Sequence, residues 1–227
     1  MKTKRIVIRT ILLIILSLLS LALTAAGVFA AMGWNMHSEA IEARPVRQVY
    51  ADASAEEHFV AFSELPGFYV DAVTATEDRD FWGHSGIDPS AICRALLHDL
   101  AAMEFAEGGS TITMQTAKNI YYTQDKRLER KAAELFTAFE LEDKLTKEQI
   151  FELYVNTIYF GSNYYGIYAA SMGYYGVPPQ GLTDEQCAVL AGIPQAPSAY
   201  SPDNSPELAE QRAEQVRNSM RECGYLE

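Results

Sequence analysis

The chain has 227 residues, 48% of them apolar, which is enough for one domain with a buried core and an appendage. Its formal net charge of −12 argues against a nucleic-acid partner, because a phosphate backbone requires basic surface. The three cysteines cannot all pair with one another, and no CxxC or His/Cys pattern indicates zinc. Cys93 and Cys187 lie among apolar residues and are expected to be buried free thiols.

The N-terminus has the pattern of a membrane anchor. Residues 1–9 contain four Lys or Arg, and residues 10–38 contain no charged side chain. Residues 10–31 match the roughly 20 apolar residues that span a bilayer core, and the basic tail should stay cytoplasmic, with the rest of the chain outside. A cleaved signal peptide, with Val28-Phe29-Ala30 as its cleavage site, is the alternative.

The remaining chain divides into three predicted parts. Residues 32–60 are polar and contain Arg44-Pro45, so we expect an irregular stalk. Residues 61–204 form the predicted main domain, and residues 205–227 form an amphipathic C-terminal helix. No segment has several convincing alternating strands, so the domain should be mainly α.

Local patterns predict a series of helices within these parts. Two capping boxes, starting at Thr146 and Thr183, mark helix starts in which a side chain caps the backbone three residues on. The predicted helices cover residues 65–76, residues from Pro89 to about 100, and residues 125–144, 147–156, 187–193 and 205–224.

Residues 77–88 are the most unusual polar stretch. They combine several acids with an Arg, a His and two aromatic rings, and they lie between two predicted helices. Asp88-Pro89 is typical of a helix N-cap followed by Pro at the first helical position. This stretch can direct side chains into a cleft, although a solvated acidic loop would look the same.

A second polar stretch covers residues 108–119. Gly108 and Gly109 permit close backbone approach, and hydroxyl groups and a Lys follow within two helical turns. This combination suits an anionic or sugar ligand. A plain helix start with Ser110 as its N-cap is compatible with the same pattern.

In the helix predicted over residues 125–144, an apolar stripe indicates the buried face; its members are Leu128, Ala132, Leu135 and Phe139. Arg130 and Glu134 lie four residues apart and away from that stripe. On its own, such a pair is most simply a surface ion pair worth a few tenths of a kcal/mol.

Taken together, these stretches resemble the family 51 glycosyltransferases, the peptidoglycan polymerases, over about residues 60–202. The matching motifs, in chain order, are Glu77-Asp78 with Phe81, His84 and Gly86; Gly108 to Thr113; Lys118-Asn119; Arg130 to Glu134; Glu152 to Asn156; Tyr165-Gly166-Ile167; and Leu190 to Pro197. Two positions depart from the family pattern: Met114 stands where the first of two glutamines is usual, and Val155 replaces a Leu. The chain is also more acidic than expected for an enzyme that acts on an anionic lipid.

The resemblance implies a mainly α fold, with a lysozyme-like helical lobe, a smaller membrane-proximal lobe and one preceding transmembrane helix. The implied substrate is lipid II, whose sugar is joined to the growing lipid-linked glycan through a β-1,4 bond with inversion at the anomeric carbon. The implied catalytic residues are Glu77, as the general base, and Glu134. The implied substrate-binding residues are Asp78, Phe81, His84, Gly109, Ser110, Thr111, Gln115, Lys118, Arg130 and Asn156.

The reaction explains why such residues are needed. A sugar hydroxyl requires a base, whereas the pyrophosphate leaving group is already a stable anion and requires positive charge, which Lys118, Arg130 and Lys131 can supply. A divalent cation, Mg²⁺ or Mn²⁺, is left open, with Glu134 as its candidate contact. No organic cofactor and no metal site built by the protein are expected. The membrane is an expected partner, and proteins of cell-wall synthesis or division are candidate partners.

Two other functions are consistent with the same residues. A lysozyme-like muramidase would use Glu77 and Glu134 as its pair of carboxylates. An inactive membrane-anchored cell-wall scaffold would retain the fold, and the Met114 departure is the feature that favours it. The Ser-x-x-Lys and Lys-Thr-Gly signatures of a serine transpeptidase do not occur, so a monofunctional enzyme is expected.

Overall fold

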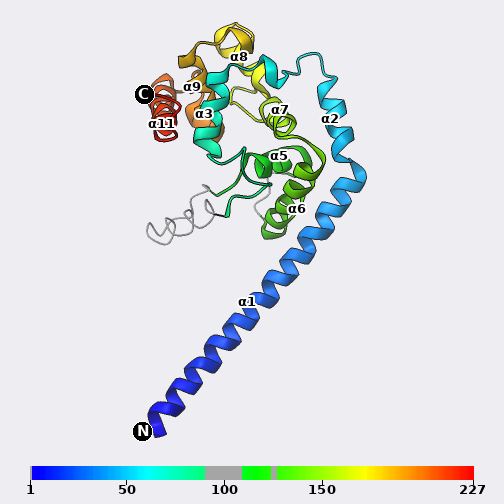
Figure 1. Ribbon diagram of the computed structural model, residues 1–227, viewed down its shortest axis with the longest axis vertical. Coiled ribbons are helices and arrows are strands. Elements are labelled where there is room, and N and C mark those ends of the chain that lie inside the picture. Colours follow the sequence, from blue (N-terminus) through cyan, green and yellow to red (C-terminus); the bar gives the residue numbers. More distant parts are fainter. Residues whose placement is uncertain (1, 90–108, 124–126) are drawn as a thin grey trace.

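A single long helix, α1 (Lys2–Ala43), projects from a helical domain in the computed structural model of the chain (Figure 1). The structure describes residues 2–89, 109–123 and 127–227, with side chains from residue 9 onward. The helix expected after Pro89, together with Cys93, lies outside the described residues.

Helix α1 is the one described helix that is long and apolar enough to cross a membrane. Its large apolar side chains between residues 11 and 23 are exposed, and none of them is buried against the described part of the chain. A single membrane span and a signal sequence are both consistent with this helix.

The expectation of an irregular stalk over residues 32–60 is wrong for residues 32–54. Helix α1 continues to Ala43, and after a short break at Arg44-Pro45 helix α2 covers Val46–Ser54. Between residues 32 and 54 the helical conformation is interrupted only at Arg44-Pro45, where Pro45 disfavours it in the preceding residue, and residues 55–60 form turns and irregular chain. The polar composition of this segment reflects one exposed face of a helix rather than an irregular chain.

The other helices form two groups around a central helix, α7 (Lys147–Thr157). One group comprises α3 (Gly67–Glu77), α9 (Asp184–Gly192) and α11 (Pro206–Glu222), which pack against one another. The other comprises α5 (Ile112–Tyr121) and α6 (Leu128–Lys144), with α6 lying on α1. The core is apolar, and α7 contributes Ile150, Phe151, Leu153, Tyr154 and Val155 to it, all fully buried.

Short helices complete the domain. They are η1 (Phe62–Glu64), α8 (Ile167–Tyr175), η2 (Pro179–Gly181), η3 (Ile193–Gln195) and α10 (Pro197–Tyr200). The described residues contain no strand, only an isolated antiparallel bridge between Tyr159 and Tyr165. The mainly α prediction is therefore confirmed, and the division into a lysozyme-like lobe and a smaller lobe stays a prediction.

Both predicted capping boxes are present. The Thr146 hydroxyl accepts from the Gln149 backbone N–H, and the Thr183 hydroxyl accepts from that of Gln186. At α5 the cap differs from the expectation, because Thr111 rather than Ser110 is the N-cap and accepts from the Met114 N–H. Cys187 is a buried free thiol, as expected.

The predicted buried face of α6 is wrong at Leu128 and Phe139, whereas Ala132 and Leu135 are partly buried. Leu128 is 66% exposed and Phe139 is 42% exposed, and neither belongs to the core. The residues that are buried in α6 are Ala133, Glu134, Thr137, Ala138 and Leu141. Small and polar side chains are buried here because α6 lies between α1 and α5 and approaches both closely. A stripe of large apolar residues therefore does not identify its inner face.

Candidate active site

Glu77 is the last residue of α3 and lies where α3 meets α5. The Gln115 side-chain amide, from α5, donates a hydrogen bond of 2.8 Å to Glu77 Oε2. Burial raises the pKa of the Glu77 carboxyl, while the Gln115 hydrogen bond and the charges of Arg212 and Lys118 act to lower it. The net shift is upward, so Glu77 is a carboxylate in a partly dehydrated site with two cations near enough to act on it.

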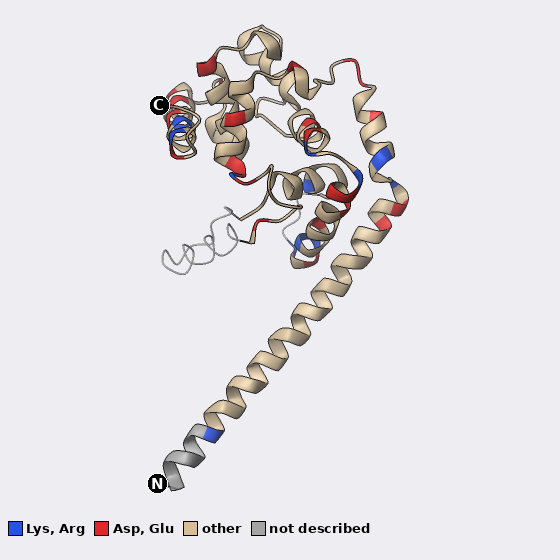
Figure 2. Cartoon of the chain, viewed as in Figure 1, with Lys and Arg blue, Asp and Glu red and all other residues tan. Residues whose placement is uncertain are grey.

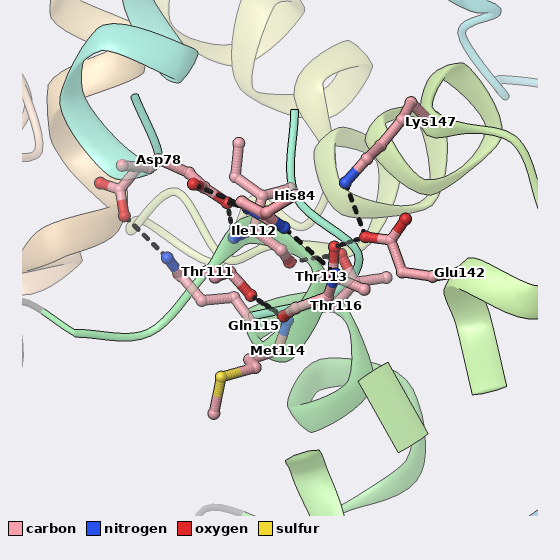
Figure 3. A network of polar contacts seen from close by, with 12 residues as sticks. Asp78, His84, Thr111, Ile112, Thr113, Met114, Gln115, Thr116, Glu142 and Lys147 are labelled. Atoms are coloured by element: carbon pink, nitrogen blue, oxygen red, sulfur yellow. Dashed lines mark hydrogen bonds and ion pairs between the residues drawn. The ribbon is translucent and has the colours of Figure 1, made fainter. Parts of the chain in front are cut away.

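Asp78 follows Glu77 but has a different environment. Its carboxylate accepts from His84 Nε2 at 2.9 Å and from the Ile112 backbone N–H at 2.9 Å (Figure 3). Ile112 is the first residue of α5, where unpaired N–H groups and the helix dipole favour a negative charge. Asp78 thus joins the 77–88 stretch to the start of α5.

The orientation of His84 follows from its second ring nitrogen. The Gly86 N–H donates to His84 Nδ1 at 3.1 Å, which leaves Nε2 to carry the proton that Asp78 accepts. Gly86 has a φ of +95°, a backbone conformation that glycine adopts readily. Its carbonyl in turn accepts from the Thr111 hydroxyl at 2.7 Å. His84 and Thr111 therefore hold the loop against α5.

Phe81 belongs to the same 77–88 stretch and is fully buried. The Lys147 ammonium lies 4.4 Å from the centre of its ring and donates to Glu142 Oε1 at 2.7 Å. The same Glu142 oxygen accepts from the Thr113 hydroxyl at 2.6 Å (Figure 3). The sequence analysis did not predict Glu142 and Lys147, because their part in the site depends on contacts between α5, α6 and α7.

Arg130 and Glu134 do not form a surface pair. Glu134 is 1% exposed and its Oε1 is paired with Arg130, while its Oε2 lies 3.1 Å from the Lys131 ammonium. Lys131 also donates to the Ser110 hydroxyl at 2.7 Å. One buried carboxylate thus holds two cations next to the residues that precede α5. We call Ser110, Arg130, Lys131 and Glu134 the cationic cluster.

Asn156 is used within the fold. Its side chain accepts from the Val60 N–H and donates to the Val60 carbonyl, both at 2.9 Å. The neighbouring Glu152 accepts from the Tyr50 hydroxyl and the Phe62 N–H, each at 2.7 Å. These two residues of α7 attach the chain after α2 to the domain.

The residues predicted for the site therefore fall into three sets. Glu77, Gln115 and Lys118 act on one another at the junction of α3 and α5. Ser110, Arg130 and Glu134 belong to the cationic cluster, next to the partly buried Gly109. The polar side chains of the third set are engaged within the protein, and Phe81 is buried: Asp78, Phe81, His84, Thr111 and Asn156.

A model of the family described as "Transglycosylase" matches residues 42–221. The chain belongs to the transglycosylase family. The match starts before the end of α1 and includes nearly all of α11, so it extends beyond the span covered by the predicted motifs.

Individual relatives agree with this assignment. The chain is 44% identical to penicillin-binding protein 1A of Aquifex aeolicus and 42% identical to penicillin-binding protein 1F of Bacillus subtilis. Each match covers 74% of this chain. It spans only 23% of the length of either protein. A putative transglycosylase of Cupriavidus necator is 40% identical, over 74% of this chain and 72% of that protein.

One departure of this transglycosylase from the family pattern has a structural explanation. Met114 is 3% exposed, and its side chain points away from Asp78 and His84 (Figure 3). The position is one of packing, which an apolar thioether suits. Gln115, the neighbouring residue, makes the contact with Glu77.

Arg212 was missed by the sequence analysis, which placed α11 outside the main domain. Helix α11 packs on α3 and α9, and the Arg212 Nε donates to the Gly192 carbonyl at 3.3 Å. From this position the positive charge of Arg212 acts to lower the pKa of Glu77. No signal near residue 212 indicates this role, because it depends on the position of α11 against α3.

Proposed function

We propose that this transglycosylase polymerises lipid II into β-1,4-linked glycan strands, with polyprenyl pyrophosphate as the leaving group and inversion at the anomeric carbon. The observation that carries the proposal is the separation of two sites with different chemistry. Glu77 is a carboxylate with a raised pKa at the junction of α3 and α5. The cationic cluster is a second site, at the start of α6.

Glu77 suits the role of general base. The 4-hydroxyl of the acceptor sugar must lose its proton as the new bond forms, and a base with a pKa nearer to neutrality accepts that proton more effectively. Burial raises the pKa of Glu77 towards that range, while Gln115 orients the carboxylate through Oε2. Such a base contributes about 10²–10⁴-fold to the rate.

The cationic cluster suits the leaving group. A departing pyrophosphate requires positive charge and hydrogen-bond donors aimed at its oxygens, which Arg130, Lys131 and the Ser110 hydroxyl can provide. Glu134 holds both cations in place. Lys118 lies close enough to Glu77 for its charge to act on the carboxylate, so it can contact parts of the substrate that lie between the two sites.

The same geometry favours a transferase over a muramidase. A muramidase of the usual kind needs two carboxyl groups at the scissile bond, and Glu77 with its raised pKa could serve as the acid. Both oxygens of Glu134 are already paired with cations, so Glu134 is not available as the second carboxylate. Glu134 therefore acts as a positioning residue for Arg130 and Lys131.

A divalent cation would have little support from the protein itself. No group of three or more His, Cys, Asp or Glu side chains that could hold a metal occurs within residues 9–89, 109–123 and 127–227. The oxygens of Glu134 face Arg130 and Lys131, and these two cations oppose a metal ion there. We therefore assign no step to a metal ion.

We further propose that α1 anchors the protein in the cell membrane as a single span, with the basic tail cytoplasmic and the domain outside. The length and apolar surface of α1 support a span. The lipid of the substrate confines it to the bilayer, so an anchored enzyme meets it by diffusion within the membrane.

A polymerisation assay tests the function. Purified full chain in detergent is given lipid II without ATP or sugar nucleotide, and the products are separated on a gel. We expect glycan polymer, and Glu77→Gln should reduce its formation about 10²–10⁴-fold. Cleavage of preformed glycan without extension of lipid II would favour a muramidase. Absence of both activities across several detergents and added Mg²⁺ or Mn²⁺ would favour a scaffold.

A further inference from the structure

Helix α6 lies beside the upper part of α1 and runs in the same direction (Figure 1). Three levels of contact define this arrangement. Gly33 faces Ala132, His37 bonds Thr137 at 2.9 Å, and Ile41 lies near Glu140 and Lys144 around a shared hollow. Residue numbers increase in the same direction along both helices, so the helices are parallel and each of these α1 residues has one set of neighbours on α6.

The contact at Gly33 is close enough to require glycine. A Cβ atom at residue 33 would lie 2.5 Å from the Ala132 Cβ and 2.9 Å from the Ala133 backbone nitrogen. Gly27, six residues earlier on α1, has nothing within 4 Å of such an atom. One glycine of α1 is therefore needed for helix packing, whereas the other faces open space.

A buried polar contact fixes the same register. His37 is 6% exposed, and its Nδ1 bonds the Thr137 hydroxyl, which lies 2.5 Å from the Tyr122 hydroxyl. A slide of α1 along α6 would break the bond between His37 and Thr137 and leave the buried His37 Nδ1 without this partner, at a cost of about 1–3 kcal/mol. The buried contact between His37 and Thr137 therefore favours this one register between the two helices.

This register gives the cationic cluster a definite height along α1. Helix α1 rises about 36 Å from Arg9 to Gly33 at 1.5 Å per residue. A bilayer has a hydrocarbon core of about 30 Å and measures about 40–45 Å with its headgroups. With Arg9 in the cytoplasmic headgroup layer, Gly33 lies in the outer one. Arg130 and Glu134 flank the Ala132 level, so they lie at that height.

We propose that the packing of α6 along α1 holds the cationic cluster in the outer headgroup layer, where a membrane-bound lipid carries its phosphates. The inference rests on the proposed function and on α1 crossing the membrane. Two surface features agree with it. Figure 2 shows basic residues at the end of α6 nearest the apolar part of α1, in a chain with a net charge of −12. Leu128, in the first turn of α6, is 66% exposed and would contact lipid.

Two variants with matched controls test the proposal. A seven-residue helical insertion rich in Ala and Gln between Ala31 and Met32 keeps the contacts of Gly33, His37 and Ile41 with α6 but raises the domain by about 10 Å. The same insertion between Met1 and Lys2 is its control. Gly33→Leu separates the helices, and Gly27→Leu adds the same side chain where there is room.

Each variant is assayed on long-chain lipid II in vesicles and on a short-chain, water-soluble lipid II analogue. We expect the 31/32 insertion and Gly33→Leu to lose about tenfold or more in kcat/KM on the vesicle substrate. On the soluble analogue the insertion variant should remain close to wild type, and so should both controls on either substrate. Equal loss of the insertion variant on both substrates, or no loss on vesicles, would overturn the proposal.

A depth measurement separates this inference from the proposed function. A fluorescent non-natural amino acid at position 128 is quenched by lipids brominated at known depths. In the wild-type anchor, bromines nearest the headgroups should quench most strongly, and the 31/32 insertion should abolish that quenching. Equal fluorescence in the two proteins would refute the proposal even if lipid II is polymerised. If neither substrate is polymerised, the proposed function fails and depth alone decides.

Discussion

The side-chain amide of Gln115 donates a 2.8 Å hydrogen bond to Oε2 of Glu77, joining the end of α3 to the middle of α5. This hydrogen bond stabilises the charged form of Glu77 and opposes the effect of burial on its pKa. A change at Gln115 is therefore expected to change the pKa of Glu77, the proposed base.

Replacing Gln115 should therefore change the pH dependence of activity. In Gln115→Leu the pKa of Glu77 should rise further, because burial is then less opposed. A base acts only when ionised, so the acid limb of the kcat/KM profile should move to higher pH. Gln180→Leu is the control, since Gln180 bonds the exposed Glu64 on η1. An acid limb that stays in place or moves to lower pH would contradict this assignment.

Glu77→Gln should lose turnover without losing stability. Because folding raises the pKa of Glu77, its contribution to stability is fully present below the unfolded pKa and is lost as pH rises through the folded pKa. The charged carboxylate thus costs stability near neutral pH, and the neutral amide avoids that cost. We expect a melting temperature at pH 8 equal to or above that of the wild type, with the difference shrinking towards pH 4. Turnover should fall about 10²–10⁴-fold, and near-wild-type turnover would remove Glu77 from the mechanism.

Arg130→Ala should affect both rate and stability. Removing Arg130 leaves Glu134 buried, with Lys131 as its remaining charged partner, and should cost about 2–3 kcal/mol, somewhat less than a fully orphaned buried charge. Turnover should fall about 10²–10³-fold if Arg130 contacts the leaving pyrophosphate. Arg130→Lys should not fully restore it, because an ammonium cannot contact two phosphate oxygens in the manner of a guanidinium.

Arg221→Ala is a suitable comparison for this change. Arg221 pairs with Glu214 on the exposed surface of α11, and such pairs contribute about 0.2–1 kcal/mol. Turnover and melting temperature are measured on the same preparations. If Arg130→Ala resembles Arg221→Ala in both, Arg130 is an ordinary helix-surface residue after all.

Asp78→Ala should act mainly through stability. The substitution removes the acceptor for both His84 and the Ile112 N–H, and hydrogen bonds to a charged group contribute about 1.5–3 kcal/mol. Chemical denaturation should show a loss in that range or above it. Asp80→Ala, two residues on at an exposed position, should stay within about 0.5 kcal/mol. Similar stabilities for the two variants would mean that Asp78 does not hold α5 in place.

The topology of α1 can be tested in cells. We expect the basic tail to be retained, because residues 10–31 are longer than the apolar part of a usual signal peptide. Protease added to intact spheroplasts should digest the domain, and N-terminal sequencing should recover the start of the chain. A mature N-terminus at Ala31 would replace the anchor with a cleaved signal peptide.

Features that depend on neighbours in the chain could be predicted from the amino-acid sequence. The capping boxes at Thr146 and Thr183 were predicted because a side chain three residues away completes each of them. The long apolar helix and the mainly α class follow equally from local composition and periodicity. Glu77 and Arg130 were identified because the family motifs are continuous short segments.

The environment of each side chain, in contrast, depends on how the helices pack in the fold. Residues 32–43 were expected to be irregular, and the spacing of Arg130 and Glu134 was also consistent with a surface ion pair. Instead, α1 continues to Ala43, and Glu134 is buried where α6 lies between α1 and α5. Leu128 is exposed and Glu134 is buried, the reverse of what is usual for an apolar and a charged side chain. The close approach of α6 to its neighbours selects small residues at the interface, and the paired cations offset the cost of burying the Glu134 charge. Arg212 acts on Glu77 across 135 positions of sequence. No local pattern encodes such a contact, since it exists only where α11 packs against α3.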